Sequence, residues 1–477
     1  MASLIPQNSA AFSLAEAAAL CGGVLLGEDA ACVGITTDSR HDLRGQLFVA
    51  LRGERFDGHE FAREAADRGA AGVLVEREVP GLAIGAVKVA STLTALGTLG
   101  SAHRRRWGKR LVAVAGSAGK TTTRSTITAL LSALPGVNVH FAAGNLNNLI
   151  GVPLVLLGLR AGDELGVVEI GTNAPGEVRT LSLLAEPNVA VLTLIGIEHS
   201  EGLGDIDGIE REEGEIWSGL SASGVAVWNA DDERVRRTVS EAKPAISIGY
   251  GKATDASYRL LSRSSTALGG SRLQIERHTA HVSGSITLET PLLGDAGAYA
   301  TLAALAVAEW VASSALSAEI VNAALGTAGE PGRLTPITLA DGTVLLDDSY
   351  NSNPASVESS LTAAREVATA RHARLLLVIG EMRELGPRSV DFHREVAENI
   401  AKSGASRLIA VGGDAAEFVA PAQARGLAAE FAANADDALS LLLAQVEPGD
   451  VVLVKASRGV RAERVVRGLL EAKGRAA

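Results

Sequence analysis

A short apolar run at residues 111–115 leads directly into the segment Gly-Ser-Ala-Gly-Lys-Thr at 116–121, and a helix-like run follows. Glycines let a backbone wrap closely around an anion, and the N–H groups at the start of a helix point at it. In such a loop Lys120 contacts the outer phosphates of a nucleotide, and the Thr121 hydroxyl reaches a Mg²⁺ ion. The longer form of the motif has a glycine where this chain has Val114. The segment predicts an ATP or GTP site on a strand–loop–helix unit of an α/β fold.

The composition favours a folded protein with several domains. The 477 residues leave room for about three domains, and the charge of −11 argues against general affinity for nucleic acid or anionic membranes. Cys21 and Cys32 are too few for a disulfide framework and fit a reducing cytosol. The chain has no run of the ~18–20 apolar residues that span a bilayer, and its start does not resemble a signal peptide. We therefore expect a cytoplasmic protein that does not insert into a membrane.

The first block, residues 1–107, mixes short strands with a helix. We expect strands at 47–50 and 72–75 and a helix at 59–68. The basic stretch at 103–106 closes a further helix, where cations are favourable. A nucleic-acid patch is the alternative interpretation of that stretch.

The second and third blocks, 108–330 and 331–477, alternate strands with helices, which predicts largely parallel sheets. In the second block an alternating, Ser/Thr-rich stretch at 252–290 predicts a small antiparallel sheet. The third block has the pattern of a doubly wound unit. The expected strands are 111–115, 167–170, 189–194 and 224–228 in the second block, and 343–347, 374–379, 407–411 and 450–454 in the third.

Two polar residues lie at or near the ends of the next predicted strands along the chain. Glu169 lies at the end of its strand, and a carboxylate at the C-terminal end of a parallel strand faces the ligand crevice. It is well placed to hold Mg²⁺ beside Thr121. His199 follows the next strand, where it is either a second metal ligand or a structural hydrogen-bonding residue.

Further segments, taken in order and spacing, resemble those of the Mur ligases across all three blocks. Those in the first block look like uridine-nucleotide-binding segments. The segments 347–354 and 380–386 are most similar to the member that adds D-alanyl-D-alanine, and the Asp-Asn-Pro-Arg motif of the tripeptide-adding member is missing. The matching segments are 36–40, 53–59, 116–121, 144–148, 169–173, His199, 347–354, 380–386 and 455–459.

The resemblance implies ATP-dependent ligation of D-alanyl-D-alanine to UDP-N-acetylmuramoyl-tripeptide, through an acyl phosphate, in peptidoglycan synthesis. It implies ATP and Mg²⁺, small-molecule substrates, no nucleic acid, and a monomer. The implied fold is α/β with three domains. These are a small α/β UDP-substrate domain at 1–107, a central P-loop ATPase-like parallel-sheet domain at 108–330, and a C-terminal doubly wound Rossmann-like domain at 331–477 on the D-Ala-D-Ala side.

The resemblance also implies roles for individual residues. The implied catalytic residues are Lys120, His199 and Glu213. Those implied to bind the nucleotide are Gly116, Ser117, Ala118, Gly119, Lys120, Thr121, Thr122, Arg333 at a phosphate and Asp348 at the ribose. Those implied to bind the other substrates are Ser39, Arg40, Asn145, Asn148, Asn173, Tyr350, Asn351, Lys455 and Arg458. The implied metal ligands are Thr121, Glu169, His199 and Glu213.

Plainer interpretations of these residues stay open. The carboxylate pair at 347–348 resembles the region before a helix, and the asparagines at 145–148 are typical of a turn. Segment 36–40 fits an Asx turn with a surface arginine. Lys455 and Arg458 fit solvated side chains.

Two positions depart from the family pattern. The Mur ligases usually carry a His-Asn pair and a second asparagine that read adenine, and this chain has Ala296, Gly297 and Ala300 there. Either backbone groups read the base or selectivity is weak. The family also has a lysine, carbamylated by CO₂, where this chain has Glu213. A glutamate is anionic without modification, so we expect no need for bicarbonate. A solvated helix residue is the alternative for Glu213.

Three rival functions remain from the sequence. The first two are the sibling tripeptide-adding ligase and a folylpolyglutamate-type amino-acid ligase. The third is a catalytically silent UDP-sugar-binding relative, which the altered adenine site suggests. Retention of Lys120, Glu169 and His199 argues against the silent relative.

Overall fold

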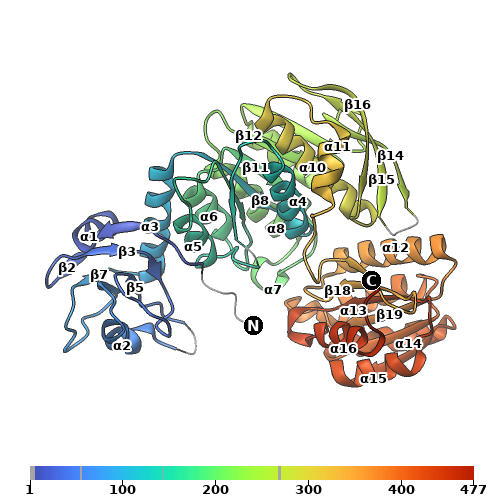
Figure 1. Ribbon diagram of the computed structural model, residues 1–477. Helices are drawn as coiled ribbons and strands as arrows, with labels where there is room; N and C mark the ends of the chain where they lie inside the picture. Colours follow the sequence, from blue (N-terminus) through green and yellow to red (C-terminus); the bar gives the residue numbers. More distant parts are fainter. Residues whose placement is uncertain (1–5, 54–55, 143, 267–269, 477) are drawn as a thin grey trace.

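A computed structural model describes residues 6–53, 56–142, 144–266 and 270–476 of the chain (Figure 1). Three main sheets follow one another along the sequence, and each packs with helices around a hydrophobic core. In Figure 1 the central sheet and its helices lie between the N-terminal part, in blue, and the C-terminal part, in orange and red. Within the described residues, no helix is both long and apolar enough to cross a bilayer.

The N-terminal part is a five-stranded sheet covered by three helices, with a separate two-stranded ribbon. The sheet order is β2-β7-β6-β5-β4, and only the β2 edge is antiparallel. The strands are β2 (Val24–Leu26), β4 (Ile35–Thr36), β5 (Leu47–Val49), β6 (Gly72–Val75) and β7 (Ala86–Lys88), and the ribbon pairs β1 (Ala11–Ser13) with β3 (Ala31–Val33). The helices are α1 (Leu14–Cys21), α2 (Ala62–Asp67) and α3 (Thr92–Trp107). The basic residues expected at a helix end lie in the last turn of α3.

The central sheet has nine strands in the order β16-β15-β14-β13-β12-β11-β8-β10-β9. Strands β8 to β14 pair in parallel, because helices cross over between most of them. These strands are β8 (Arg110–Ala115), β9 (Val139–Phe141), β10 (Leu165–Glu169), β11 (Val189–Leu192), β12 (Val225–Asn229), β13 (Ile246–Gly251), β14 (Tyr258–Ser265), β15 (Ser271–His278) and β16 (Ser283–Thr290).

Helices cover both faces of the central sheet. One face packs against α4 (Lys120–Ser132), α10 (Gly294–Ala312) and α11 (Ala318–Leu325). The other packs against α5 (Gly151–Leu157), α6 (Glu177–Ala185), α8 (Ile206–Gly214) and α9 (Glu233–Ala242). Strands that are buried on both faces of a sheet have continuously apolar sequences, and β8, whose last five residues are apolar and buried, is an example.

The antiparallel strands expected at 252–290 are present, but they do not form a separate small sheet. β14 pairs in parallel with β13, so β14, β15 and β16 extend the central sheet at one edge. This attachment of β14 to the central sheet is made through β13, a strand that was not predicted from the sequence.

The C-terminal part is a six-stranded doubly wound sheet in the order β17-β18-β22-β19-β20-β21, which confirms the expected fold class. Its strands are β17 (Thr335–Thr338), β18 (Val344–Asp348), β19 (Leu375–Gly380), β20 (Arg407–Val411), β21 (Ala428–Ala432) and β22 (Val451–Lys455). One face packs against α12 (Pro354–Arg371), α13 (Ser389–Ala401) and α14 (Val419–Ala424), and the other against α15 (Ala435–Gln445) and α16 (Glu463–Lys473). α12 begins sharply because Asn353 caps it and Pro354 occupies its first turn.

Candidate active site

A cavity of about 670 Å³ lies where the central and C-terminal parts meet. Its central wall comes from the loops that follow β8, β10 and β11, whose carboxyl ends lie side by side in the sheet. Crevices at such strand ends are the usual ligand sites of open α/β sheets. The opposite wall comes from residues around the start of α12 and the end of β22. The cavity therefore needs both parts of the chain.

Segment 116–121, called the phosphate loop below, is held in place by Thr193, which directly follows β11. Gly116 and Gly119 have φ of 125° and 82°, a backbone region that favours glycine. A Cβ at Gly116 would collide with the side chain of Thr193, whose hydroxyl donates to the Ala118 carbonyl at 2.7 Å. α4 begins directly after Gly119, and the N–H groups at the start of a helix bind phosphate. The sequence-predicted residues 117–122 all line the cavity.

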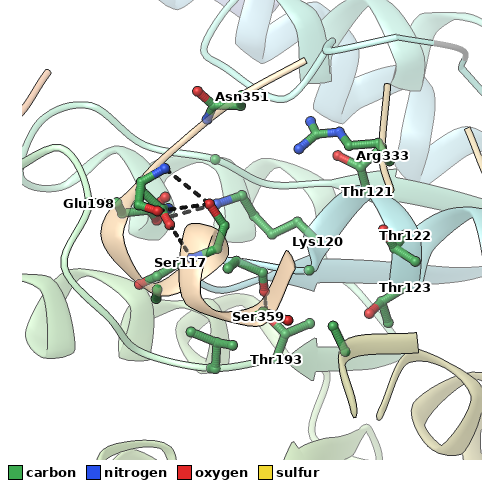
Figure 2. A pocket seen from close by; sticks show the side chains of 18 of the residues that line it. Ser117, Lys120, Thr121, Thr122, Thr123, Thr193, Glu198, Arg333, Asn351 and Ser359 are labelled. Atoms are coloured by element: carbon green, nitrogen blue, oxygen red, sulfur yellow. Dashed lines mark hydrogen bonds and ion pairs between the residues drawn. The ribbon is translucent and has the colours of Figure 1, made fainter. Parts of the chain in front are cut away.

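Lys120 is mostly buried and lies among carboxylates. Its Nζ donates to the Gly116 carbonyl and, at 3.3 Å, to Glu198 Oε1, and Figure 2 shows the two side chains pointing toward one another. Burial lowers the pKa of Lys120, but attraction to Glu198, Glu213 and other carboxylates outweighs it, so the pKa is raised. The amine is therefore held as a cation.

Glu213 lies beneath the phosphate loop rather than in the cavity. Its side chain is fully buried, so the solvated alternative is wrong. Oε2 accepts from the Gly116 N–H at 2.8 Å, whereas Oε1 has no partner among the described residues. Burial raises the pKa of Glu213 to about 8, with Lys120 opposing and Glu198 adding to the shift. This geometry gives the carboxylate a direct hold on the loop but no exposed face toward a ligand.

Thr121 and Glu169 line the same wall of the cavity. Glu169 Oε1 accepts from Asn147 Nδ2 at 2.9 Å, and Oε2 lies 3.4 Å from the buried Arg124 Nε. Arg124 also forms an ion pair with Glu330. The contacts with Asn147 and Arg124 therefore hold the Glu169 carboxylate in one orientation. Among the described residues no three His, Cys, Asp or Glu side chains gather into a metal centre.

His199 lies at the boundary between the two parts. It lines the cavity, and its Nδ1 is 2.7 Å from Glu384 Oε2 of the C-terminal part. That hydrogen bond lowers the pKa of Glu384, although burial opposes the shift.

The C-terminal wall holds a buried ion pair and an aromatic ring that two arginines approach. Lys455 Nζ donates to Asp348 Oδ2 at 2.6 Å and to the Asn351 carbonyl at 3.0 Å. Burial lowers the pKa of Lys455, against the attraction of Asp348, so it is not the solvated lysine of the plainer interpretation. The guanidinium groups of Arg333 and Arg458 lie 4.2 and 4.9 Å from the ring centre of Tyr350. All these residues line the cavity.

The far end of the cavity is formed by the start of α10, where the family pattern has His and Asn. Ala296 and Ala300 line it, and neither offers a side-chain amide. A Cβ at Gly297 would lie 2.6 Å from Leu292 Cβ, so the packing leaves no room for an asparagine there. Tyr299 donates to Asp231 at 2.5 Å beside this end.

Some sequence-predicted residues lie elsewhere. Ser39 and Arg40 are in the N-terminal part and do not line this cavity. Asp38 accepts from the Arg40 N–H at 2.9 Å, which is the Asx turn of the plainer interpretation. Residues 54 and 55 of the second uridine-like segment lie outside the described residues. Asn145, Asn148, Asn173 and Asn351 line the cavity, and Asn148 Oδ1 also accepts from the Gly151 N–H at 2.8 Å.

Sequence reasoning missed Glu198, Glu384, Asn147 and Asn229 as cavity residues. Three of them stood inside or beside quoted segments: Asn147 in 144–148, Glu384 in 380–386, and Glu198 directly before His199. Asn229 is the last residue of β12. Polar residues at the carboxyl ends of parallel strands face the ligand crevice, and this signal, which identified Glu169 at the end of β10, could also have identified Asn229.

Three domain descriptions of one family match the chain. They are "Mur ligase family, catalytic domain" at residues 32–101, "Mur ligase middle domain" at 114–308, and "Mur ligase, glutamate ligase domain" at 332–458.

Relatives match over almost the whole chain. The UDP-N-acetylmuramoyl-tripeptide–D-alanyl-D-alanine ligase of Escherichia coli K12 is 35% identical over 468 residues, 96% of this chain and 98% of the relative. The ligase of the same name from Bacillus subtilis 168 is 33% identical and covers 92% and 93%. A crystal structure of MurF from Acinetobacter baumannii has a TM-score of 0.83 at 28% identity and covers 98% and 99%. MurF from Thermotoga maritima in complex with ADP has a TM-score of 0.78 at 26% identity and covers 92% and 97%.

Proposed function

The chain belongs to the Mur ligase family, and we propose that it joins D-alanyl-D-alanine to UDP-N-acetylmuramoyl-tripeptide with ATP. The product is the pentapeptide precursor of peptidoglycan, released with ADP and phosphate. The relatives named for this reaction cover more than nine-tenths of the chain. An ADP complex of one structural neighbour supports the use of ATP.

One observation carries the mechanism: the phosphate loop and the Arg333–Tyr350–Arg458 cluster line a single cavity. A nucleotide at the loop therefore faces residues of the C-terminal part. Ligation needs such an arrangement, because an amine must reach a carboxyl group activated at the nucleotide.

In the proposed reaction the terminal carboxylate of the tripeptide attacks the γ-phosphorus of ATP and ADP leaves. The amine of D-alanyl-D-alanine then attacks the acyl carbon, the C–O bond to phosphate breaks, and an amine proton is lost. Both reactants of the first step are anions, so charge neutralisation is the main task. We assign it to Lys120, which the carboxylates keep cationic, with Arg333 approaching from the opposite wall.

Mg²⁺ is part of the proposal. Thr121 and Glu169 provide hard oxygen donors in the wall that holds the phosphate loop, and His199 lines the same cavity. Mg²⁺ usually takes one or two carboxylates and completes its shell with phosphates and water, so the donor set fits without a cluster of three ligands. When bound, the ion would supply positive charge at the phosphates.

Glu213 has a supporting role in this proposal. Its carboxylate holds the Gly116 N–H and lies close to Lys120, but it does not line the cavity. The prediction that it holds a metal directly therefore has no support from the geometry. We assign it to the position of the loop.

The three expected domains receive separate tasks. We propose that residues 1–107 bind the uridine nucleotide through Ser39 and Arg40, and that 108–330 bind ATP. Residues 331–477 would receive D-alanyl-D-alanine, with Asn351, Lys455 and Arg458 at the cavity. A monomer in the cytoplasm also stays part of the proposal.

The test is phosphate release from ATP with UDP-N-acetylmuramoyl-tripeptide, with and without D-alanyl-D-alanine, followed by mass analysis of the product. We expect sustained release and a pentapeptide product only with the dipeptide. Addition of a single amino acid instead would indicate the tripeptide-adding or folylpolyglutamate-type activity. No product with any acceptor would indicate the silent relative.

A further inference from the structure

We propose that Glu384 is a positioning residue for His199. By accepting the Nδ1–H of the ring, it leaves Nε2 as the free nitrogen toward the phosphate-loop side of the cavity. The inference rests on the proposed function and extends it. Because Glu384 belongs to the C-terminal part, the ring of His199 is oriented only when that part contacts the central part.

The contact joins residues far apart in the chain. His199 follows β11 in the central part, and Glu384 lies in the segment after β19, with His199 Nδ1 2.7 Å from Glu384 Oε2. Segment 380–386 is one of the two segments that most resemble a single member of the family, and the proposed reaction assigns it no other role.

Both residues have an unusual backbone. His199 and Glu384 have φ of 47° and 64°, a region that non-glycine residues seldom adopt. Such conformations persist where the surroundings hold them, and they gather at functional sites. Here the surroundings are each other's loops, since the Ser200 hydroxyl donates to the Leu385 carbonyl at 3.4 Å. A Cβ at Gly386 would lie 3.3 Å from Glu201 Cα, so the two loops are in close contact.

The loop that carries Glu384 is anchored within its own part. The Met382 N–H donates to His393 Nε2 at 3.0 Å, and the Arg383 N–H donates to the Ser457 hydroxyl at 2.9 Å. Met382 and Leu385 are buried on either side of Glu384. The carboxylate is thus presented from a fixed loop, although the side chain itself is 62% exposed.

The chemistry follows from the imidazole ring. A neutral histidine has one N–H and one acceptor nitrogen, and the partner of the first decides which nitrogen stays free. Nε2 of His199 lies 3.7 Å from Glu198 Oε2, beyond hydrogen-bond distance, and Glu198 in turn holds Lys120. Carboxylates commonly orient metal-binding histidines in this way. An exposed ion pair adds little stability, so orientation is the better explanation for this contact.

The first test reads the ring directly. Nitrogen NMR of histidine-labelled protein without ligands should show His199 as the Nδ1–H tautomer. Glu384→Ala should shift the ring toward Nε2–H, and Glu384→Gln should retain the Nδ1–H form because its amide oxygen still accepts. Glu395→Gln, an exposed glutamate of α13, is the matched control and should leave the ring unchanged. An unchanged tautomer in Glu384→Ala overturns the proposal.

The second test separates positioning from a general structural effect. Glu384→Ala should raise the Mg²⁺ concentration for half-maximal phosphate release by about 10–100-fold, with Glu384→Gln closer to wild type. In a His199→Ala background, Glu384→Ala should add no further loss. An unchanged Mg²⁺ requirement, or an additive loss, overturns the proposal. The NMR result does not depend on turnover, so it stands or falls separately from the ligation of D-alanyl-D-alanine.

Discussion

Lys120 is the residue on which the proposed chemistry depends most. Its amine is mostly buried, and Lys120 Nζ lies 3.3 Å from Glu198 Oε1. A triphosphate would replace that carboxylate as the partner of the cation. The surrounding carboxylates therefore keep the amine charged and in place.

Lys120→Ala should reduce turnover by about a hundredfold or more, because a charge-stabilising donor at a transferring group contributes roughly 3–4 kcal/mol. Binding of the UDP-substrate, measured by calorimetry, should stay unchanged, since Ser39 and Arg40 lie outside this cavity. Lys402→Ala, at an exposed lysine of the C-terminal part, is the control. Retention of more than a few per cent of kcat would remove Lys120 from its assigned role.

Glu213 should make the ligand-free protein less stable as the pH rises. The pKa of Glu213 is about 8 in the folded state, where the side chain is buried, against 4.5 for a solvent-exposed glutamate of the unfolded chain. The folded state therefore binds more protons than the unfolded state between these values. The free energy of unfolding then falls by up to about 1.4 kcal/mol per pH unit across that window, and this dependence ends above pH 8.

Glu213→Gln is nearly isosteric and removes the titration. Urea unfolding of both proteins at several pH values should show the stability of wild type falling relative to the variant as the pH rises from 5 to 8. Parallel pH dependences for the two proteins would contradict the burial of an ionisable carboxyl group at this position.

At the scale of elements, the start of α10 is where the family pattern has the residues that read adenine, and we propose that the nucleotide base lies at this end of the cavity. Ala296 and Ala300 line the cavity without an amide, and Leu292 packs into the space that a side chain at Gly297 would need. The local packing therefore leaves no room for an asparagine side chain at position 297. If the base lies here, either backbone groups read it or selectivity for adenine is weak.

Nucleotide choice should therefore be loose. A bidentate pair to a base edge gives about 1–3 kcal/mol of discrimination, so we expect GTP to support ligation within roughly a hundredfold of ATP. Ala300→Asn should increase the preference for ATP, and Ala315→Asn, at an exposed position outside the cavity, should not. A thousandfold preference of the wild type for ATP, measured as kcat/KM, would show that other groups read adenine.

Local sequence patterns were enough to predict the β8–loop–α4 unit, because its strand, glycines and helix start are adjacent in the chain. The attachment of β14 to β13 was missed, since pairing between strands is not local. β21 was missed because its sequence, AAEFA, has little of the apolar pattern of a buried strand. In the site, the loop residues predicted from the sequence line the cavity. The contacts of Lys120 with Glu198 and of His199 with Glu384 were not predicted, because they depend on how loops distant in the sequence meet.

At the scale of the whole molecule, the cavity depends on the seating of the C-terminal part. Glu366 of α12 accepts two hydrogen bonds from Arg263 of β14, at 2.7 and 2.6 Å. The same guanidinium donates to Asp295 of α10 at 2.6 Å, and Asp295 lines the cavity. These contacts connect the edge of the central sheet, the end of the cavity formed by the start of α10, and the C-terminal part.

Glu366→Gln should loosen this connection, because it removes the charge that a bidentate arginine pair requires. We expect a larger radius of gyration for the ligand-free variant in small-angle X-ray scattering. Glu358→Gln, at an exposed position of the same helix, is the control. An unchanged scattering curve for Glu366→Gln would show that other contacts hold the C-terminal part in place.

The central claim is that a carboxylate of the UDP-substrate is activated by ATP in this cavity. The most direct measurement uses UDP-N-acetylmuramoyl-tripeptide labelled with ¹⁸O in the carboxylate that is joined to the dipeptide. Passage through an acyl phosphate transfers one of those oxygens to the released phosphate, because the C–O bond breaks when the amine attacks. The account predicts one ¹⁸O in each phosphate released with D-alanyl-D-alanine present. Phosphate released without the label would contradict it.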